Sequence, residues 1–373
     1  MTKNTVDNRR QRYFQLNSHL AQIDNNEMCQ LFDKSDSRAG WGKSHTLDIG
    51  EHKVFVKRIP ITEVEYNNMF STKNHYELPT YYNYGVGSAG FNIFRELVAH
   101  VKTTNWVLSG EVESFPLLYH YRVMPYDSEN SGERIEVKPE QLERYVTYWG
   151  GNQQIGQYRL DKLDAKYELA LFLEHIPHVL EFWLMEHSDQ IDQVLEQLRL
   201  SVDFLRKHKI IHFDANFDNI LTDGERVYLT DFGLVLDEAF DFSDEERAFF
   251  DAHPDYDFGC ILSNLIYPIY ELFKELPEDE QRQLSEKYGV LEGDDLFHKL
   301  LVLFEHLEEL RQDDVIQVDQ AYINCLLRYR DICLLMNNFY LDLRQNNHKD
   351  TKFPKAELGG LLREVGFVRE VVS

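Results

Sequence analysis

The hydrophobic pattern of the chain changes near residue 177, and this change constrains the fold most. Before it, short β-branched stretches alternate apolar and polar residues; one of them, 45–61 ("HTLDIGEHKVFVKRIPI"), predicts a hairpin. After it, apolar residues recur at helical spacing, as in 188–208, where Ser188 is the expected N-cap. The pattern predicts an α+β chain with a strand-rich first part and a larger helical second part. The other predicted elements are helices at 10–31, 91–108 and 139–149, strands at 115–124 and 168–177, and long amphipathic helices from 255 to about 345.

The composition limits which classes of partner the protein is expected to bind. With 373 residues and 43% hydrophobic residues, the chain has enough material for two parts with a buried interior. The net charge of −25 disfavours binding to nucleic acid or to an anionic membrane, because both need basic surfaces. The beginning, "MTKNTVDNRRQRYF", has no apolar signal segment, and no apolar run approaches a membrane span. We therefore expect a cytoplasmic location.

The four cysteines show no CxxC pairing. They stand in apolar surroundings, which predicts buried free thiols of a reducing compartment and not a disulfide framework or a zinc site. These cysteines are Cys29, Cys260, Cys325 and Cys333.

The stretch "IIHFDANFDNIL" (210–221) places clustered polar residues between apolar anchors. Asp214 and Asn219 lie five residues apart, and a second short strand then leads to Asp231 in "TDFG". If the two strands form a hairpin, Asn219 and Asp231 come close together. An amide oxygen beside a carboxylate suits Mg²⁺, while Asp214 stays free to deprotonate a hydroxyl. Any one of these residues alone is more simply a turn cap, but the ordered set predicts a magnesium-dependent site.

These motifs resemble those of the protein-kinase-like family. "HFDANFDN" resembles the catalytic loop HRDxxxxN, and "DFG" matches the metal-binding motif. The resemblance extends from about residue 30 to 345. It implies that Asp214 is the catalytic base, that Asn219 and Asp231 bind Mg²⁺, and that His212 packs the two loops together. It also implies a bilobal fold with a small β-rich N-lobe and a larger helical C-lobe.

The same resemblance implies an ATP site in the first half. "VFVK" ends at Lys57, which resembles the lysine that holds the α- and β-phosphates. Its expected partner is Glu96 in "FRELVAH", with Glu63 and Glu65 as alternatives nearer in sequence. "LEHIP" (173–177) resembles the segment that contacts adenine through the main chain, here at Glu174 and Ile176.

The expected phosphate loop is "AGWGKSHT" (39–46). Gly40, Gly42 and Ser44 are its candidate phosphate contacts, but His45 stands where a third glycine belongs. "GKS" also suggests a Walker A motif, which we reject because its first glycine would fall on Ser37 and a strand follows instead of a helix.

Three departures from the family pattern bear on the function. Phe213 replaces the arginine that usually pairs with a phosphorylated loop, so we expect activity without such phosphorylation. Asn216 replaces the lysine of serine/threonine protein kinases, as in small-molecule kinases of this fold. The segment after the DFG motif lacks APE, and Ser243 fits a capping box with Glu246 better than a phosphorylation site. Asp255 or Asp257 is the expected buried anchor of the catalytic loop.

The expected organisation is a helical extension (1–29), an N-lobe (30–174, with an insertion at about 125–163), a C-lobe (175–348) and a tail (349–373). The expected function is transfer of the γ-phosphate of ATP, with Mg²⁺, to an acceptor that carries a hydroxyl group. If the surface near the site is acidic, it would favour a basic acceptor. A divergent serine/threonine protein kinase stands first, a small-molecule kinase of the aminoglycoside or choline kinase type second, and a pseudokinase scaffold third.

Overall fold

The computed structural model describes residues 5–33, 37–39, 43–126, 138–289, 295–312 and 318–368. The chain is α+β, as the sequence predicts. Its described residues form two compact units: the first runs to Pro177 and includes Tyr228–Arg247, and the second comprises His178–Val227 and the residues from Ala248 onward. No helix in the described part is long and apolar enough to cross a membrane.

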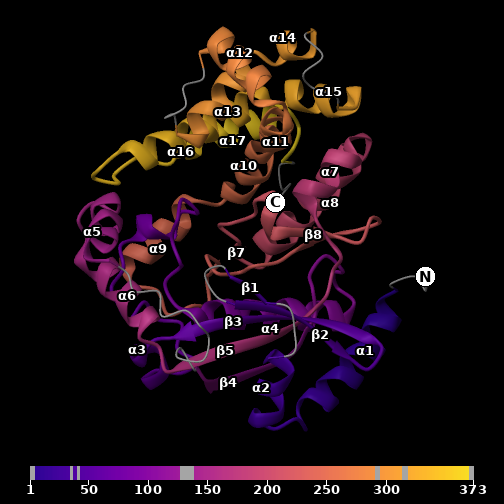
Figure 1. The fold of residues 1–373 in the computed structure, drawn as a ribbon, viewed down its shortest axis with the longest axis vertical. Helices are drawn as coiled ribbons and strands as arrows, with labels where there is room; N and C mark the ends of the chain where they lie inside the picture. Colours follow the sequence, from indigo (N-terminus) through magenta and orange to yellow (C-terminus); the bar gives the residue numbers. More distant parts are fainter. Residues whose placement is uncertain are drawn as a thin grey trace. The chain divides into compact units, whose positions relative to one another are not determined.

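The first unit contains an antiparallel five-stranded sheet with the order β1-β2-β3-β5-β4 (Figure 1). The predicted hairpin is formed by β2 and β3, which turn at Gly50 with φ +62°. The strands are β1 (Ser37–Ala39), β2 (Lys43–Ile49), β3 (His52–Ile61), β4 (Leu118–Pro125) and β5 (Tyr167–Glu174).

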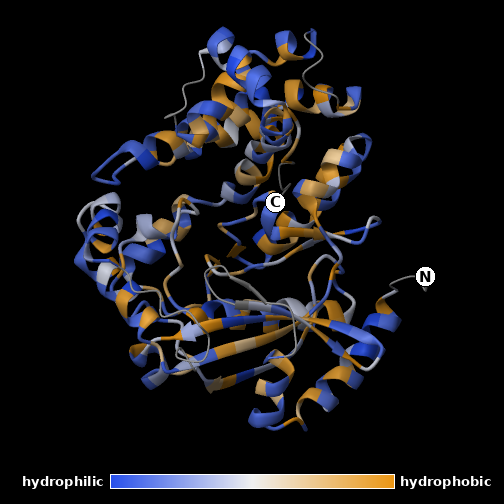
Figure 2. Ribbon diagram, viewed as in Figure 1, coloured by the Kyte–Doolittle hydropathy of each residue, from blue (hydrophilic) through white to orange (hydrophobic). Residues whose placement is uncertain are grey.

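Helix α4 (Ile93–Ser109) packs against this sheet. The side chain of Asn92 accepts the amide of Phe94 and begins the helix, and Gly110 ends it with φ +85°. Phe94 and Leu97 are buried among the apolar side chains of β3, β4 and β5, and Figure 2 shows the hydrophobic residues along these strands. The packing fixes which side of α4 faces the sheet.

The remaining helices of the first unit correct two predictions. The segment predicted as one helix at 10–31 forms two, because the chain turns between them, and Cys29 lies exposed on the outer side of the second while Met28 and Phe32 are buried. The predicted insertion contains a helix that the sequence analysis missed, α6, and buries Trp149. These helices are α1 (Val6–Leu20), α2 (Asn25–Asp33), α3 (Glu63–Asn67), η1 (Thr80–Asn83), α5 (Pro139–Tyr148) and α6 (Gln153–Leu163).

The second unit is mainly helical. A short antiparallel pair of strands, β6 and β8, lies near its start. The strands and 3-10 helices are β6 (His178–Val179), η2 (Ser188–Gln190), β7 (Ile210–Ile211), η3 (Phe217–Asn219), β8 (Ile220–Thr222) and η4 (Asn264–Ile266). The α-helices are α7 (Leu180–Glu186), α8 (Ile191–Lys207), α10 (Tyr256–Ser263), α11 (Tyr267–Glu275), α12 (Glu278–Tyr288), α13 (Leu296–Glu305), α14 (Leu307–Gln312), α15 (Gln320–Arg328), α16 (Arg330–Gln345) and α17 (Lys355–Glu364).

The segment Tyr228–Arg247 belongs to the first unit and contains most of β9 (Val227–Leu229), all of β10 (Leu236–Asp237) and the beginning of α9 (Asp244–Ala252). The capping box predicted before α9 is confirmed: the amide of Ser243 donates to Glu246 (3.1 Å), and the amide of Glu246 donates to Ser243 Oγ (3.2 Å).

The second unit also corrects the sequence analysis. Of the long helices predicted after residue 255, α16 has 16 residues, whereas α10 and α15 are short, with 8 and 9 residues. Ser188 does not cap α8: it begins η2, and its hydroxyl accepts the amide of Asp319. The segment expected as a tail (349–373) contains α17, and Leu358 and Leu362 of that helix are fully buried.

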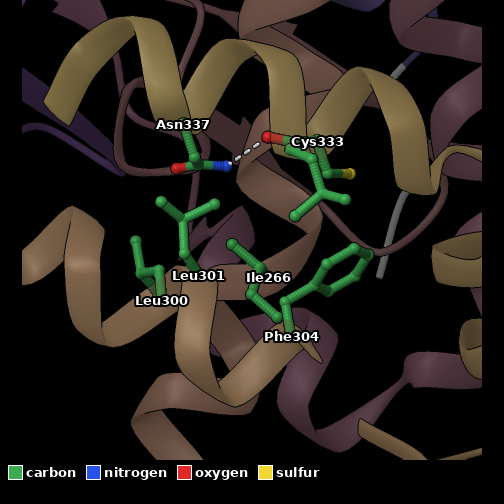
Figure 3. Close-up of a pocket in the computed structure, with 7 residues that line it drawn as sticks. Ile266, Leu300, Leu301, Phe304, Cys333 and Asn337 are labelled. Carbon is green, nitrogen blue, oxygen red and sulfur yellow. Dashed lines mark hydrogen bonds between the residues drawn. The ribbon is translucent and has the colours of Figure 1, made fainter. Parts of the chain in front are cut away.

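An apolar crevice lies between η4, α13 and α16 (Figure 3). Its walls include Ile266, Leu300, Phe304 and Cys333. Asn337 donates from Nδ2 to the carbonyl of Cys333 (2.9 Å), which Figure 3 marks with a dashed line. Such walls offer no charged group to a phosphate or a metal ion, so this crevice does not fit the predicted magnesium and phosphate site.

Candidate active site

Lys57 is the centre of a charged cluster in the first unit. Its Nζ lies 2.7 Å from Glu96 Oε1 and 2.8 Å from Asp231 Oδ1. Lys57 comes from β3, Glu96 from the first turns of α4, and Asp231 from the segment after β9. Burial opposes the charge of the ammonium group, but Asp231 and Glu96 outweigh it and raise the pKa of Lys57. The lysine is therefore held protonated between two carboxylates.

The structure distinguishes among the three glutamates considered as partners of Lys57. Glu65 is buried in a capping box with Thr62 and also accepts the amide of Ile93. Glu63 is exposed in the first turn of α3. Glu96 alone of the three contacts Lys57, across 39 residues of sequence.

Asp231 has a left-handed backbone conformation, with φ +58°. For a residue other than glycine this conformation is uncommon and marks backbone strain that the surroundings must hold in place. Gly233 donates its amide to Asp231 Oδ1 (3.3 Å). The backbone of Gly90 approaches Gly233 so closely that a Cβ on Gly90 would lie 2.1 Å from the carbonyl oxygen of Gly233. The loop before α4 thus supports the strained turn at Asp231.

The predicted catalytic loop lies in the second unit. Both carboxylate oxygens of Asp214 accept hydrogen bonds, from Asn216 Nδ2 (2.9 Å) and from Asn219 Nδ2 (2.8 Å). Asn216 Oδ1 accepts the amide of Asn219 and so begins η3. The arrangement fixes the rotamer of Asn219 and leaves its Oδ1 without a hydrogen bond from the described residues. That oxygen is thereby available as a ligand.

Asp257 of α10 anchors this loop, and Asp255 does not. Its carboxylate accepts the amides of His212 (2.7 Å) and Phe213 (2.9 Å). Burial raises the pKa of Asp257 to about 6, although the two amides oppose the shift. Asp255 instead pairs with Arg206 (3.0 Å). His212 is fully buried and accepts the amide of Asp214 at Nδ1 (3.3 Å), so it orders the loop from inside.

An aromatic cluster surrounds Phe213, the residue at the family's arginine position. Its ring stacks on Tyr256 (4.4 Å between centroids) and on Phe249 (5.3 Å), and it contacts His253 (5.3 Å). Phe213 has φ +65°. The loop is therefore held here by apolar packing and not by an ion pair.

We expect His253 to make the second unit sensitive to acid. Burial lowers its pKa to about 4; the carbonyl of Phe249 opposes the shift and Lys355 adds to it. In the unfolded chain the histidine pKa is ~6.5, so the unfolded chain binds the proton before the folded one does. The folded state is therefore most stable above pH ~6.5, and this part of its stability is lost as the pH falls towards 4. Between pH ~7.5 and ~5.5, His253 should account for about 1 kcal/mol of lost unfolding free energy.

His253→Phe should remove this part of the pH response, because phenylalanine keeps the aromatic packing but cannot titrate. The measurement is urea unfolding of both proteins at the two pH values. Equal losses of stability in the wild type and the variant would contradict the assignment.

The structure describes only some of the residues that the sequence predicts to contact adenine and phosphate. The amide of Glu174 donates to the carbonyl of Leu117 (2.8 Å), and its buried side chain pairs with Arg9 of α1 (2.7 Å). Ile176 is buried. The amide of Glu174 is therefore already engaged inside the unit, and a main-chain contact of this segment with a base stays a prediction.

In the phosphate loop, Gly40 and Gly42 lie outside the described residues. Ser44 is in β2, opposite Lys57 of β3. His45 is buried, stacks on Phe32 and lies 3.2 Å from Arg58 through Nε2, so it is packed into the unit.

Two residues near these loops were missed by the sequence analysis. Burial, together with the neighbouring acid Asp218 of the predicted catalytic loop, raises the pKa of Glu181 of α7 to about 9. His100, one turn after Glu96, is fully buried and lies edge-on to Phe232 (4.9 Å). In the sequence, the only signal for these two residues is their distance from the predicted site residues, such as the spacing of four residues from Glu96 to His100.

The predicted metal ligands are oxygen donors of the kind that Mg²⁺ takes, an amide oxygen and a carboxylate. Taken separately, Asn219 Oδ1 of the second unit, which accepts no hydrogen bond from the described residues, and the half-exposed carboxylate of Asp231 in the first unit are donors of this kind. In the described part of the chain no three His, Cys, Asp or Glu side chains gather to hold a metal by themselves.

The site residues thus divide between the units: Lys57, Glu96 and Asp231 lie in the first, and His212, Asp214 and Asn219 in the second. Comparison of the sequence with family models finds no match, and a search of curated proteins finds no significant match.

Proposed function

We propose that this protein is an ATP- and magnesium-dependent phosphotransferase with a bilobal protein-kinase-like fold. The observation that carries the proposal is the contact of Lys57 with both Glu96 and Asp231. A strand lysine paired with a helix glutamate beside the DFG aspartate is the arrangement that phosphoryl transfer by this fold uses.

In this proposal the residues have separate tasks. Lys57 binds the α- and β-phosphates, and Glu96 orients its ammonium group. Asn219 and Asp231 hold Mg²⁺, which neutralises phosphate charge when bound. Asp214 accepts the proton of the acceptor hydroxyl; the acceptor oxygen forms its bond to the γ-phosphorus as the bond to the β–γ bridging oxygen breaks, and ADP leaves. Gly40, Gly42, Ser44, Glu174 and Ile176 remain proposed nucleotide contacts.

A protein hydroxyl is the first proposed acceptor, and a small molecule is the second. Asn216 favours the small molecule, because an asparagine at this position cannot steady the γ-phosphate with a positive charge as a lysine would. Its side chain instead binds Asp214 and begins η3. The proposed location is the cytoplasm.

The proposal is tested by incubating the protein with Mg²⁺ and γ-labelled ATP, with and without extract from its source cells. Protein-bound label and label on small molecules are then measured separately. Label on protein supports a protein kinase, and label only on a metabolite supports a small-molecule kinase. No label in either fraction, with nucleotide still bound, would leave the scaffold function.

Lys57→Met provides the variant for this assay, and Lys43→Met provides its matched control. Both lysines lie in the β2–β3 hairpin, and Lys57 is the one whose Nζ binds Glu96 and Asp231 in the proposal. We expect Lys57→Met to lower labelling by on the order of 100-fold, because the phosphates lose their positioning charge. Lys43→Met should stay near wild type. A strong loss in Lys43→Met alone would instead favour the rejected Walker A interpretation.

A further inference from the structure

Arg95, the residue of α4 just before Glu96, forms a second charged pair with Glu246 of α9. Arg95 Nη2 is 2.6 Å from Glu246 Oε1, and both side chains are almost fully buried, with exposed fractions of 2% and 3%. Arg95 Nε also donates to the carbonyl of Thr72 (2.7 Å). Both partners belong to the first unit.

The surroundings of this pair are built around the guanidinium group. Its central carbon lies 5.2 Å from the ring centroid of Phe91, 5.4 Å from that of Phe240 and 5.5 Å from that of Phe242. Stacked aromatic faces favour a guanidinium group over a primary ammonium group. Burial lowers the pKa of Arg95 even with Glu246 beside it, so the pair is kept at a desolvation cost.

Glu246 is held from its other side. While Oε1 receives Arg95, Oε2 accepts the amide of Ser243 in the capping box of α9. The carboxylate therefore has little freedom of its own. It connects the beginning of α4 to the beginning of α9.

The segment after β9 is tied to α4 at further points. Asp231 meets α4 through Lys57 and Glu96, and Asp237 pairs with Lys102, two turns beyond Arg95. Neighbouring side chains on a helix point in different directions, so bonds at adjacent positions restrict rotation of the helix about its axis. The pair of Arg95 with Glu246 thus limits how Glu96 can turn away from Lys57.

We propose that Arg95 and Glu246 are positioning residues that hold α4 in the rotation at which Glu96 meets Lys57, with no covalent modification required. Their effect on turnover rests on the proposed function, whereas their effect on the geometry does not. A purely structural role would stabilise the first unit without changing the Lys57 contact selectively.

The test measures the acylation rate of individual lysines in the full-length protein without nucleotide, by mass spectrometry. Lys57 is the reporter, because an ammonium group held by carboxylates reacts slowly. Lys162, paired with Glu65 in the same unit (3.2 Å), is the internal reference. The variant is Glu246→Gln, which keeps the capping box but removes the charge that pairs with Arg95. Ser243→Ala is the matched control, because it removes the cap hydroxyl and leaves that charge in place.

Glu246→Gln should raise the acylation of Lys57 relative to Lys162 by about threefold or more, because α4 then samples rotations that release Glu96. Ser243→Ala should leave the ratio unchanged. Arg95→Lys, which keeps the charge but loses the planar group, should give a smaller rise and replaces Glu246→Gln if that variant does not fold. An unchanged ratio in the folded variants, or an equal rise at both lysines, would overturn the proposal.

Turnover of labelled ATP is measured on the same samples. With the proposed function correct, Glu246→Gln lowers kcat more than it raises KM for ATP, since the phosphate-binding residues are all still present. A wild-type protein that fails to use ATP would refute the proposed function while the lysine acylation still tests the positioning pair.

Discussion

Asp214→Asn should abolish phosphoryl transfer while nucleotide binding stays within a few-fold of wild type. The variant keeps the size of the side chain but removes the carboxylate that would take the acceptor proton. Loss of a general base lowers rates by on the order of 10²- to 10⁴-fold. One of the two hydrogen bonds from Asn216 and Asn219 should persist, because asparagine retains one acceptor oxygen.

The measurements are single-turnover transfer from γ-labelled ATP and calorimetric titration with ADP and Mg²⁺. Asp218→Asn is the control, because it neutralises an exposed acid in the same loop without touching the proposed base. Full activity of Asp214→Asn would remove Asp214 from the mechanism. A parallel loss in both variants would indicate that charge in the loop, and not the base, limits transfer.

Local patterns in the sequence were sufficient to predict β2, β3, α4 and the capping box before α9, because each depends on residues within a few positions. They were also sufficient to choose Glu96. Glu96 stands beside the apolar residues Phe94 and Leu97, which pack against the sheet, and its carboxylate reaches Lys57 of β3. The close approach of Asn219 and Asp231 through a hairpin stays a prediction.

Contacts between distant residues were beyond such patterns. Arg9 and Glu174 are separated by 165 residues, and Arg95 and Glu246 by 151, and nothing near any of them in sequence indicates its partner. The same limit explains why the sequence did not indicate that the side chain of Glu174 is buried against Arg9. Cys29 was predicted as buried from its apolar neighbours, but the helical turn places Met28 and Phe32 inward and Cys29 outward.

Asp231→Asn should remove the dependence of nucleotide binding on magnesium and lower transfer by on the order of 10²-fold or more, because the carboxylate is the charged metal ligand of the proposal. The fold should survive, since asparagine tolerates the φ of +58° at this position about as well as aspartate does. Lys57 would keep its contact with Glu96.

The measurement is titration with ADP in the presence of Mg²⁺ or of EDTA, with the thermal midpoint as a check of folding. Asp223→Asn, in the turn before β9, is the control for loss of one carboxylate. If Asp231→Asn still bound ADP more tightly with Mg²⁺ than with EDTA, the metal would have to be held by other residues, and Asp231 would be left with the role of a partner for Lys57.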